Sequence, residues 1–151
     1  MKKGIDLSTY QRNLDYQALK DAGVEFAIIR SGYGKDSGQK DDMFEEHYAG
    51  CKAVGIKVGA YLYSYCTSIE NAEKEAYNCL SHIEGKTFEL PIFYDLEEQR
   101  TAILGTEAVT EIAKRFCKNA HANTPMQPPT INPVNKPIVK YLLLFILLYL
   151  P

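Results

Sequence analysis

Short apolar runs alternate with amphipathic segments along the first 118 residues of the chain. The apolar runs predict strands, and apolar residues at helical spacing predict helices. The predicted strands are Gly4–Leu7, Val24–Ile29, Ile56–Tyr65 and Leu90–Tyr94. The predicted helices are Leu14–Ala22, Asp41–Val54, a segment that opens at Thr67 and carries apolar residues to Ile83, and Thr106–Lys118. A strand followed by a helix, four times over, indicates a parallel sheet.

Local signals mark several of the expected helix ends. Gly23 and Gly55 follow the first two predicted helices, where glycine commonly forms the C-terminal cap. Thr67 and Glu70 have the spacing of a capping box, which predicts the start of the third helix.

The predicted fold is α/β, and two architectures fit the strand–helix alternation. One is a parallel (β/α) barrel of irregular TIM-like type, of which this chain would supply the first four βα units. The other is an open, doubly wound sheet. No G-x-G-x-x-G motif or phosphate-binding loop follows any predicted strand, which weakens the nucleotide-binding version of the open sheet.

Composition limits the class of protein and of partner. The chain has 151 residues, 46% of them hydrophobic and 24% charged, with a net charge of −2, which is typical of a globular domain and gives no basic surface for nucleic acid. The four cysteines lack C-x-x-C spacing, so we expect reduced, structural cysteines and neither a metal site nor a cofactor. Because the first strand begins almost at Met1, no signal peptide is expected, and synthesis in the cytoplasm is predicted.

Polar or aromatic residues stand at the end of every predicted strand, where barrel active sites form. These residues are Asp6 and Ser8, Arg30, Tyr63 and Tyr65, and Asp95 and Glu97. In the third strand the tyrosines share one parity and Val58, Ala60 and Leu62 share the other. The apolar set suits a helix layer and the tyrosines suit the barrel mouth, although Tyr61 also fits an ordinary core position.

Asp95-Leu96-Glu97 is the most informative motif in the chain. On a strand, residues two apart share one face, so the Asp95 and Glu97 Cα atoms would lie about 6.5 to 7 Å apart. Two acids this close should have pKa values that differ, with one group ionised and the other protonated near neutral pH. Such a pair can cleave a glycosidic bond. The alternative is that Asp95 caps a turn and that Glu97 begins a solvated loop.

Four motifs in this order resemble the glycoside hydrolase family 25 lysozymes, N-acetylmuramidases common in phages and bacteria. The motifs are Gly4-Ile5-Asp6-Leu7-Ser8 with Gln11, Ala27-Ile28-Ile29-Arg30-Ser31-Gly32-Tyr33-Gly34, Gly59-Ala60-Tyr61-Leu62-Tyr63-Ser64-Tyr65, and Pro91-Ile92-Phe93-Tyr94-Asp95-Leu96-Glu97. The resemblance implies an irregular β/α barrel that needs no metal and hydrolyses the β-1,4 bond between N-acetylmuramic acid and N-acetylglucosamine in peptidoglycan.

The resemblance also implies roles for individual residues. Glu97 would be the general acid, Asp95 the negatively charged partner that stabilises the oxocarbenium-like centre, and Asp6 the acid that helps to set their charges. Tyr63 would contact the sugar. Tyr61, Tyr33 and Arg30 are expected to bind substrate in the same groove.

The chain departs from the family pattern after about residue 118. Positions 119–151 contain a proline-rich stretch and then the hydrophobic run Ile138–Leu150, which is shorter than the roughly 20 residues of a membrane-spanning helix. The preferred interpretation is a frameshift near Asn119, and the alternative is a natural truncation with a membrane-associating tail. Either leaves open strand edges, which favour non-specific self-association.

Two function classes therefore compete for this chain. The first is a peptidoglycan hydrolase released to act on the cell wall by secretion or phage lysis, with glycan strands as its partner and no specific protein partner. The second is an inactive truncated remnant that binds glycan at most weakly. A third class, an open-sheet enzyme unrelated to cell walls, loses because the chain has no phosphate or cofactor motif.

Overall fold

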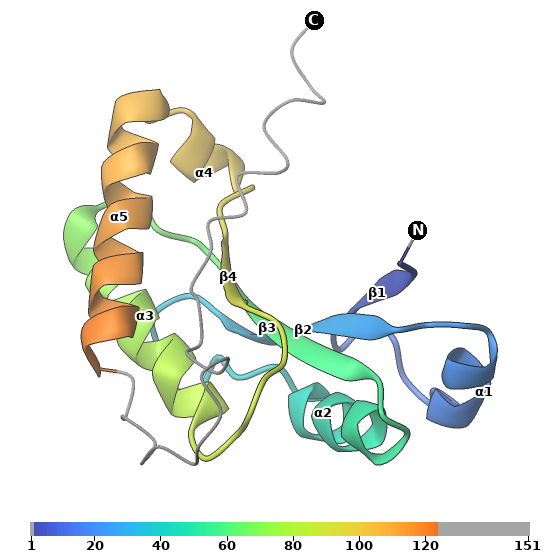
Figure 1. Cartoon of the computed structure of the whole chain (residues 1–151). Helices are drawn as coiled ribbons and strands as arrows, with labels where there is room; N and C mark the ends of the chain where they lie inside the picture. The colour runs from blue at the N-terminus through green and yellow to red at the C-terminus, as the bar shows by residue number, and fades with distance from the viewer. Residues whose placement is uncertain (1, 124–151) are drawn as a thin grey trace, which may run out of the picture.

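A computed structural model of the protein describes residues 2–123, which form an α/β fold with a four-stranded parallel sheet (Figure 1). The strands lie in chain order, each beside the one before it. They are β1 (Gly4–Leu7), β2 (Phe26–Tyr33), β3 (Lys57–Tyr63) and β4 (Ile92–Asp95). The helices are α1 (Tyr16–Asp21), α2 (Phe44–Ala53), α3 (Ile69–Ile83), α4 (Gln99–Ala102) and α5 (Thr106–Asn123). The predicted α/β class is confirmed, whereas the described strands form an open sheet and show no barrel closure.

Helices cover one face of the sheet. The buried core joins alternate strand residues such as Ala27, Val58 and Leu62 to Phe44 of α2 and Phe116 of α5. Figure 1 shows α3 and α5 side by side next to β4, and α2 beneath the middle strands. Because strand side chains alternate, the other parity points to the opposite face of the sheet.

The parity expected for β3 is confirmed. Val58, Ala60 and Leu62 are completely buried in the helix-covered core, while Tyr61 and Tyr63 are only half-buried. The predicted packing role of the cysteines also holds, since Cys51, Cys66, Cys79 and Cys117 are all free and buried. Among residues 2–123, no helix has the length and apolar character needed to span a bilayer.

Several predicted boundaries are wrong. β2 continues from Ile29 to Tyr33, because its polar end still pairs with β3 through an irregularity between Arg30 and Gly32. The third helix is capped by Ser68 rather than Thr67, since the Ser68 hydroxyl accepts a hydrogen bond from the Asn71 N–H. The short helix α4 was not predicted at all.

The last helix also runs further than predicted. α5 continues past Lys118 to Asn123. The predicted boundary between 1–118 and 119–151 stays a prediction, and the hydrophobic run Ile138–Leu150 lies outside the described residues.

Candidate active site

The strand register gathers the predicted site residues on the face of the sheet opposite the helices. Arg30 of β2 is the register partner of Tyr61, and Tyr63 of β3 is the partner of Asp95. Asp6 of β1 joins them through its hydrogen bond to Tyr61. Residues far apart in sequence thus lie at one place because the strands are parallel and in chain order.

Asp6 and Tyr61 are joined across the sheet. The Tyr61 hydroxyl donates a hydrogen bond to Asp6 Oδ1 at 3.2 Å. Burial raises the pKa of Asp6 above its ordinary value, and this outweighs the Tyr61 hydrogen bond and the Arg30 charge, which both lower it. Burial and the Asp6 charge in turn raise the pKa of Tyr61, so its hydroxyl stays a donor at neutral pH.

Asp95 holds a proton close to neutral pH. Its pKa is raised to about 7 by burial and then by the negative charges of Glu97 and Asp6. The motif predicted pKa values that differ within the acid pair, and the resemblance implied that Asp95 carries the negative charge, whereas a pKa of about 7 leaves Asp95 partly protonated at neutral pH. The strand position of Asp95 explains the difference, because its carboxyl is partly desolvated between two other acids.

Glu97 lies outside the strand. β4 ends at Asp95, so the alternation that was expected to place both carboxyls on one strand face stops before Glu97, which is exposed. The negative charge of Glu97 nevertheless raises the pKa values of Asp95 and Tyr63. After burial, Glu97 and then Glu98 are the main causes that raise the pKa of Tyr63 to about 12. The Tyr63 hydroxyl donates to Glu98 Oε2 at 3.4 Å.

Arg30 is a fixed cation inside β2 and not a residue at the strand end, which corrects the prediction. Its Nε donates to Asp41 Oδ2 at 2.7 Å, and the Asp41 side chain is fully buried. The guanidinium carbon lies 5.2 Å from the centre of the Tyr10 ring and 5.9 Å from that of Tyr33. The ion pair and the two rings hold this charge beside Asp6 and Tyr61.

Three tyrosines form an edge-to-face group next to Asp95. The ring of Tyr65 lies 5.3 Å from Tyr63 and 6.1 Å from Tyr33, measured between centroids. Tyr65 is 41% exposed, and Arg100 lies over its ring. Exposed aromatic faces of this kind suit contact with the apolar face of a sugar.

Three residues near this site were not predicted from the sequence, namely Tyr10, Asp41 and Glu98. Glu98 adjoins the predicted site residue Glu97, so its position beside the motif was the available signal. Asp41 could not be recognised, because an acid at a predicted helix start usually acts as a cap.

The described residues contain no group of three or more His, Cys, Asp or Glu side chains arranged to hold a metal ion. They offer three neighbouring carboxyl groups, a fixed arginine and exposed tyrosines instead. Such a set can donate a proton to a leaving oxygen and can stabilise a positive centre on a sugar.

Comparison with known proteins places the chain in one family. The model described as Glycosyl hydrolases family 25 matches residues 5–129. The chain is 30% identical over 79 residues to the autolytic lysozyme of Clostridium acetobutylicum, a match that covers 52% of this chain and 24% of that protein.

Solved structures share the fold. The modular autolysin LytC of Streptococcus pneumoniae superposes with a TM-score of 0.69 at 25% identity, over 80% of this chain and 30% of that one. The catalytic domain of endolysin ply40 from a Listeria monocytogenes bacteriophage gives 0.68 at 27% identity, over 82% and 60% of the two chains. The chain therefore spans only part of the length of the proteins that it matches.

Proposed function

The chain belongs to the glycosyl hydrolases family 25, and on that basis we propose that it hydrolyses the β-1,4 bond between N-acetylmuramic acid and N-acetylglucosamine in peptidoglycan. The observation that carries the proposal is the acid cluster in which burial and then the negative charges of Glu97 and Asp6 raise the pKa of Asp95. The relatives are a lysozyme, an autolysin and an endolysin, and the autolysin has been solved with a synthetic peptidoglycan ligand.

The three acids have different roles in the proposed reaction. Glu97, which is exposed and free of the strand, protonates the leaving oxygen. Asp95 faces the sugar carbon that becomes positive. Asp95 acts there in its ionised form, which that positive charge favours. Asp6 adds negative charge to the same place and is held by Tyr61.

Substrate contact falls to the tyrosines and Arg30 in this proposal. Tyr63 contacts the sugar next to the cleaved bond, and Tyr61 and Tyr33 line the same groove. Arg30 is paired with Asp41 and lies over the rings of Tyr10 and Tyr33, so it contributes a fixed positive charge. The four βα units correspond to part of an irregular barrel, whose closure would place this face inside the barrel mouth.

The test is the clearing of a suspension of purified bacterial cell walls, with wild type, Glu97→Gln and Glu84→Gln compared at equal concentration. Loss of the proton donor should slow clearing by about 10²- to 10⁴-fold in Glu97→Gln. Glu84 is exposed at the end of α3 and serves as the control, which should clear like wild type. Clearing by Glu97→Gln at the wild-type rate would remove Glu97 from the mechanism.

Glycan binding without hydrolysis is the second candidate. It is favoured by the open four-stranded sheet of residues 2–123, in which β1 and β4 each have one strand neighbour. Sedimentation of the protein with cell walls that it does not clear would support this candidate. Tyr63→Phe should then weaken sedimentation with little change in thermal stability. The cell wall is the site of action under both candidates, after release of the protein from the cytoplasm.

A further inference from the structure

A buried carboxyl on α3 holds the ends of two strands of the site. Glu75 is 1% exposed. Its Oε2 accepts hydrogen bonds from the Tyr94 hydroxyl at 2.6 Å and the Ser64 hydroxyl at 2.7 Å. Its Oε1 accepts from the Tyr65 N–H at 3.0 Å. The carboxyl therefore meets three donors, one from β4 and two from the segment that follows β3.

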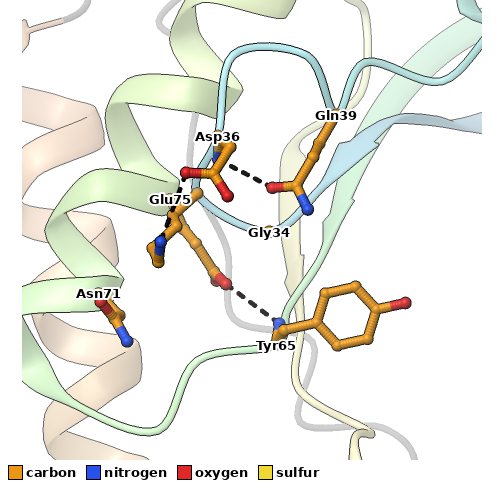
Figure 2. A pocket seen from close by; sticks show the side chains of 7 residues that line it. Gly34, Asp36, Gln39, Tyr65, Asn71 and Glu75 are labelled. Atoms are coloured by element: carbon orange, nitrogen blue, oxygen red, sulfur yellow. Dashed lines mark hydrogen bonds and ion pairs between the residues drawn. The ribbon is translucent and has the colours of Figure 1, made fainter.

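Figure 2 shows how Glu75 reaches Tyr65. The carboxyl meets the backbone nitrogen of Tyr65, while the tyrosine ring points away from Glu75. The bond lies at the wall of a small cavity of about 130 Å³, which Asn71, Asp36 and Gln39 also line. Glu75 thus fixes the path of the chain and leaves the ring of Tyr65 beside Tyr63.

Ser64 and Tyr94, which bind Glu75, are the chain neighbours of two site residues, Tyr63 and Asp95. Ser64 follows Tyr63, and its N–H donates to the Asp95 carbonyl at 2.9 Å. Tyr94 precedes Asp95, and its ring stacks on Phe116 of α5 with 3.8 Å between centroids. The stack fixes the ring from one side and Glu75 fixes the hydroxyl from the other.

A carboxyl at this position is costly to bury, and an apolar side chain would leave its donors without a partner. Burial raises the pKa of Glu75, against the hydrogen bonds from Tyr94, Ser64 and Tyr65 that lower it. Three converging donors need an acceptor with two oxygens, which explains an acid here. Ser64, Tyr65 and Tyr94 are too far from Glu75 in sequence for Glu75 to act as a local helix cap.

We propose that Glu75 is a positioning residue, which sets Asp95 and Tyr63 relative to one another by holding the ends of β3 and β4. The effect of Glu75 on catalysis rests on the proposed function. Its effect on the position of Asp95 does not, because the titration of Asp95 can be measured without turnover.

The experiment is a carboxyl NMR titration of Asp95 in the full chain, with thermal unfolding measured in parallel. Wild type, Glu75→Gln and the control Glu70→Gln are compared. Glu70 lies on the same helix in an exposed pair with Lys74. In Glu75→Gln the amide cannot accept at both positions, so the strand ends separate and Asp95 gains solvent. We expect the titration midpoint of Asp95 to fall by about one pH unit in Glu75→Gln and to stay unchanged in Glu70→Gln.

A second variant covers the case in which Glu75→Gln does not fold. Tyr94→Phe removes one donor and keeps the ring stacked on Phe116, and the Asp95 midpoint should fall in the same direction by less. A folded Glu75→Gln protein with the wild-type midpoint overturns the proposal. If only Tyr94→Phe folds, a wild-type midpoint in that variant overturns it equally.

Clearing of cell walls separates this proposal from the proposed function. If wild type clears them, Glu75→Gln should lose about 10- to 100-fold in turnover, because a small displacement of a reacting group is enough for that loss. The exposed control should lose nothing. If wild type clears none, the proposed hydrolysis fails, and the Asp95 titration alone decides whether Glu75 positions the site.

Discussion

The hydroxyl of Tyr61 donates to the carboxylate of Asp6 at 3.2 Å, so that β3 and β1 are joined across β2 by their side chains. The strand between the two residues is β2. The hydrogen bond places an uncharged donor beside the first acid of the site and lowers the pKa of that acid against the effect of burial.

Tyr61→Phe should therefore raise the pKa of Asp6 further, by about half a unit to one unit, because the ionised form loses its donor. A carboxyl NMR titration measures the pKa of Asp6 in wild type and in the variant. Tyr77→Phe is a suitable control, since Tyr77 is 53% exposed on α3. An Asp6 midpoint equal in all three proteins would mean that the hydrogen bond is absent in solution.

Asp95→Asn should stabilise the protein above pH 7 and not at pH 4. The folded pKa of Asp95 is about 7 and the unfolded value is the ordinary one near 4, so wild type loses stability as the pH rises between them. Above pH 7 the neutral amide should add about 1 to 2 kcal/mol to the free energy of unfolding, while the proposed hydrolysis should be abolished. Urea unfolding at pH 4, 6 and 8 gives the comparison. A gain of equal size at all three pH values would contradict the assignment.

Asp41→Asn should destabilise the fold by about 3 to 5 kcal/mol, because it leaves the Arg30 charge without its buried partner. The Asp41 carboxylate also accepts hydrogen bonds from the Thr9 and Met43 N–H groups. Asp42→Asn is the matched control, since Asp42 is 80% exposed in its pair with Arg12 and should change stability by less than about 1 kcal/mol. Urea midpoints that are the same for the two variants would contradict the role of Asp41.

Gly32→Ala should destabilise the protein by about 1 to 3 kcal/mol or more, because a Cβ there would lie 2.4 Å from the Gln39 carbonyl oxygen and 2.4 Å from His82 Cε1. His82 is buried and cannot yield easily. Gly38→Ala is the control, since its Cβ would meet no atom within 4 Å. Thermal unfolding of the two variants should separate them clearly, and equal melting temperatures would show that the irregularity in β2 adapts.

The sequence predicted the strands better than it predicted their ends. Continuous apolar runs identify strands that are buried by helices, so all four were found. Their ends depend on pairing with a neighbour, which no local pattern contains. β2 extends over polar residues because β3 lies beside it, and β4 ends at Asp95 although Glu97 continues the alternation.

Site residues could be predicted from the sequence where strand alternation decides which way they face. They could not be predicted where contacts with distant elements decide their position. Tyr61 and Tyr63 follow from strand alternation, and the structure places them as expected. The buried partners Asp41 and Glu75 come from other elements, and they act through hydrogen bonds that only the fold creates. The raised pKa of Asp95 also depends first on burial, which no local pattern contains.

The order of the strands has a consequence for how the chain acquires its shape. Within residues 2–123, β2, β3 and β4 each pair with the strand that precedes them in sequence, so a strand that emerges from the ribosome can pair with one already made. Each pairing closes a similar interval that contains one helix, since Gly4 pairs with Phe26, Phe26 with Lys57 and Ala60 with Ile92. The acids of the site are then brought together in synthesis order, Asp6 first and Asp95 with Glu97 last, so that the like charges meet only when β4 docks.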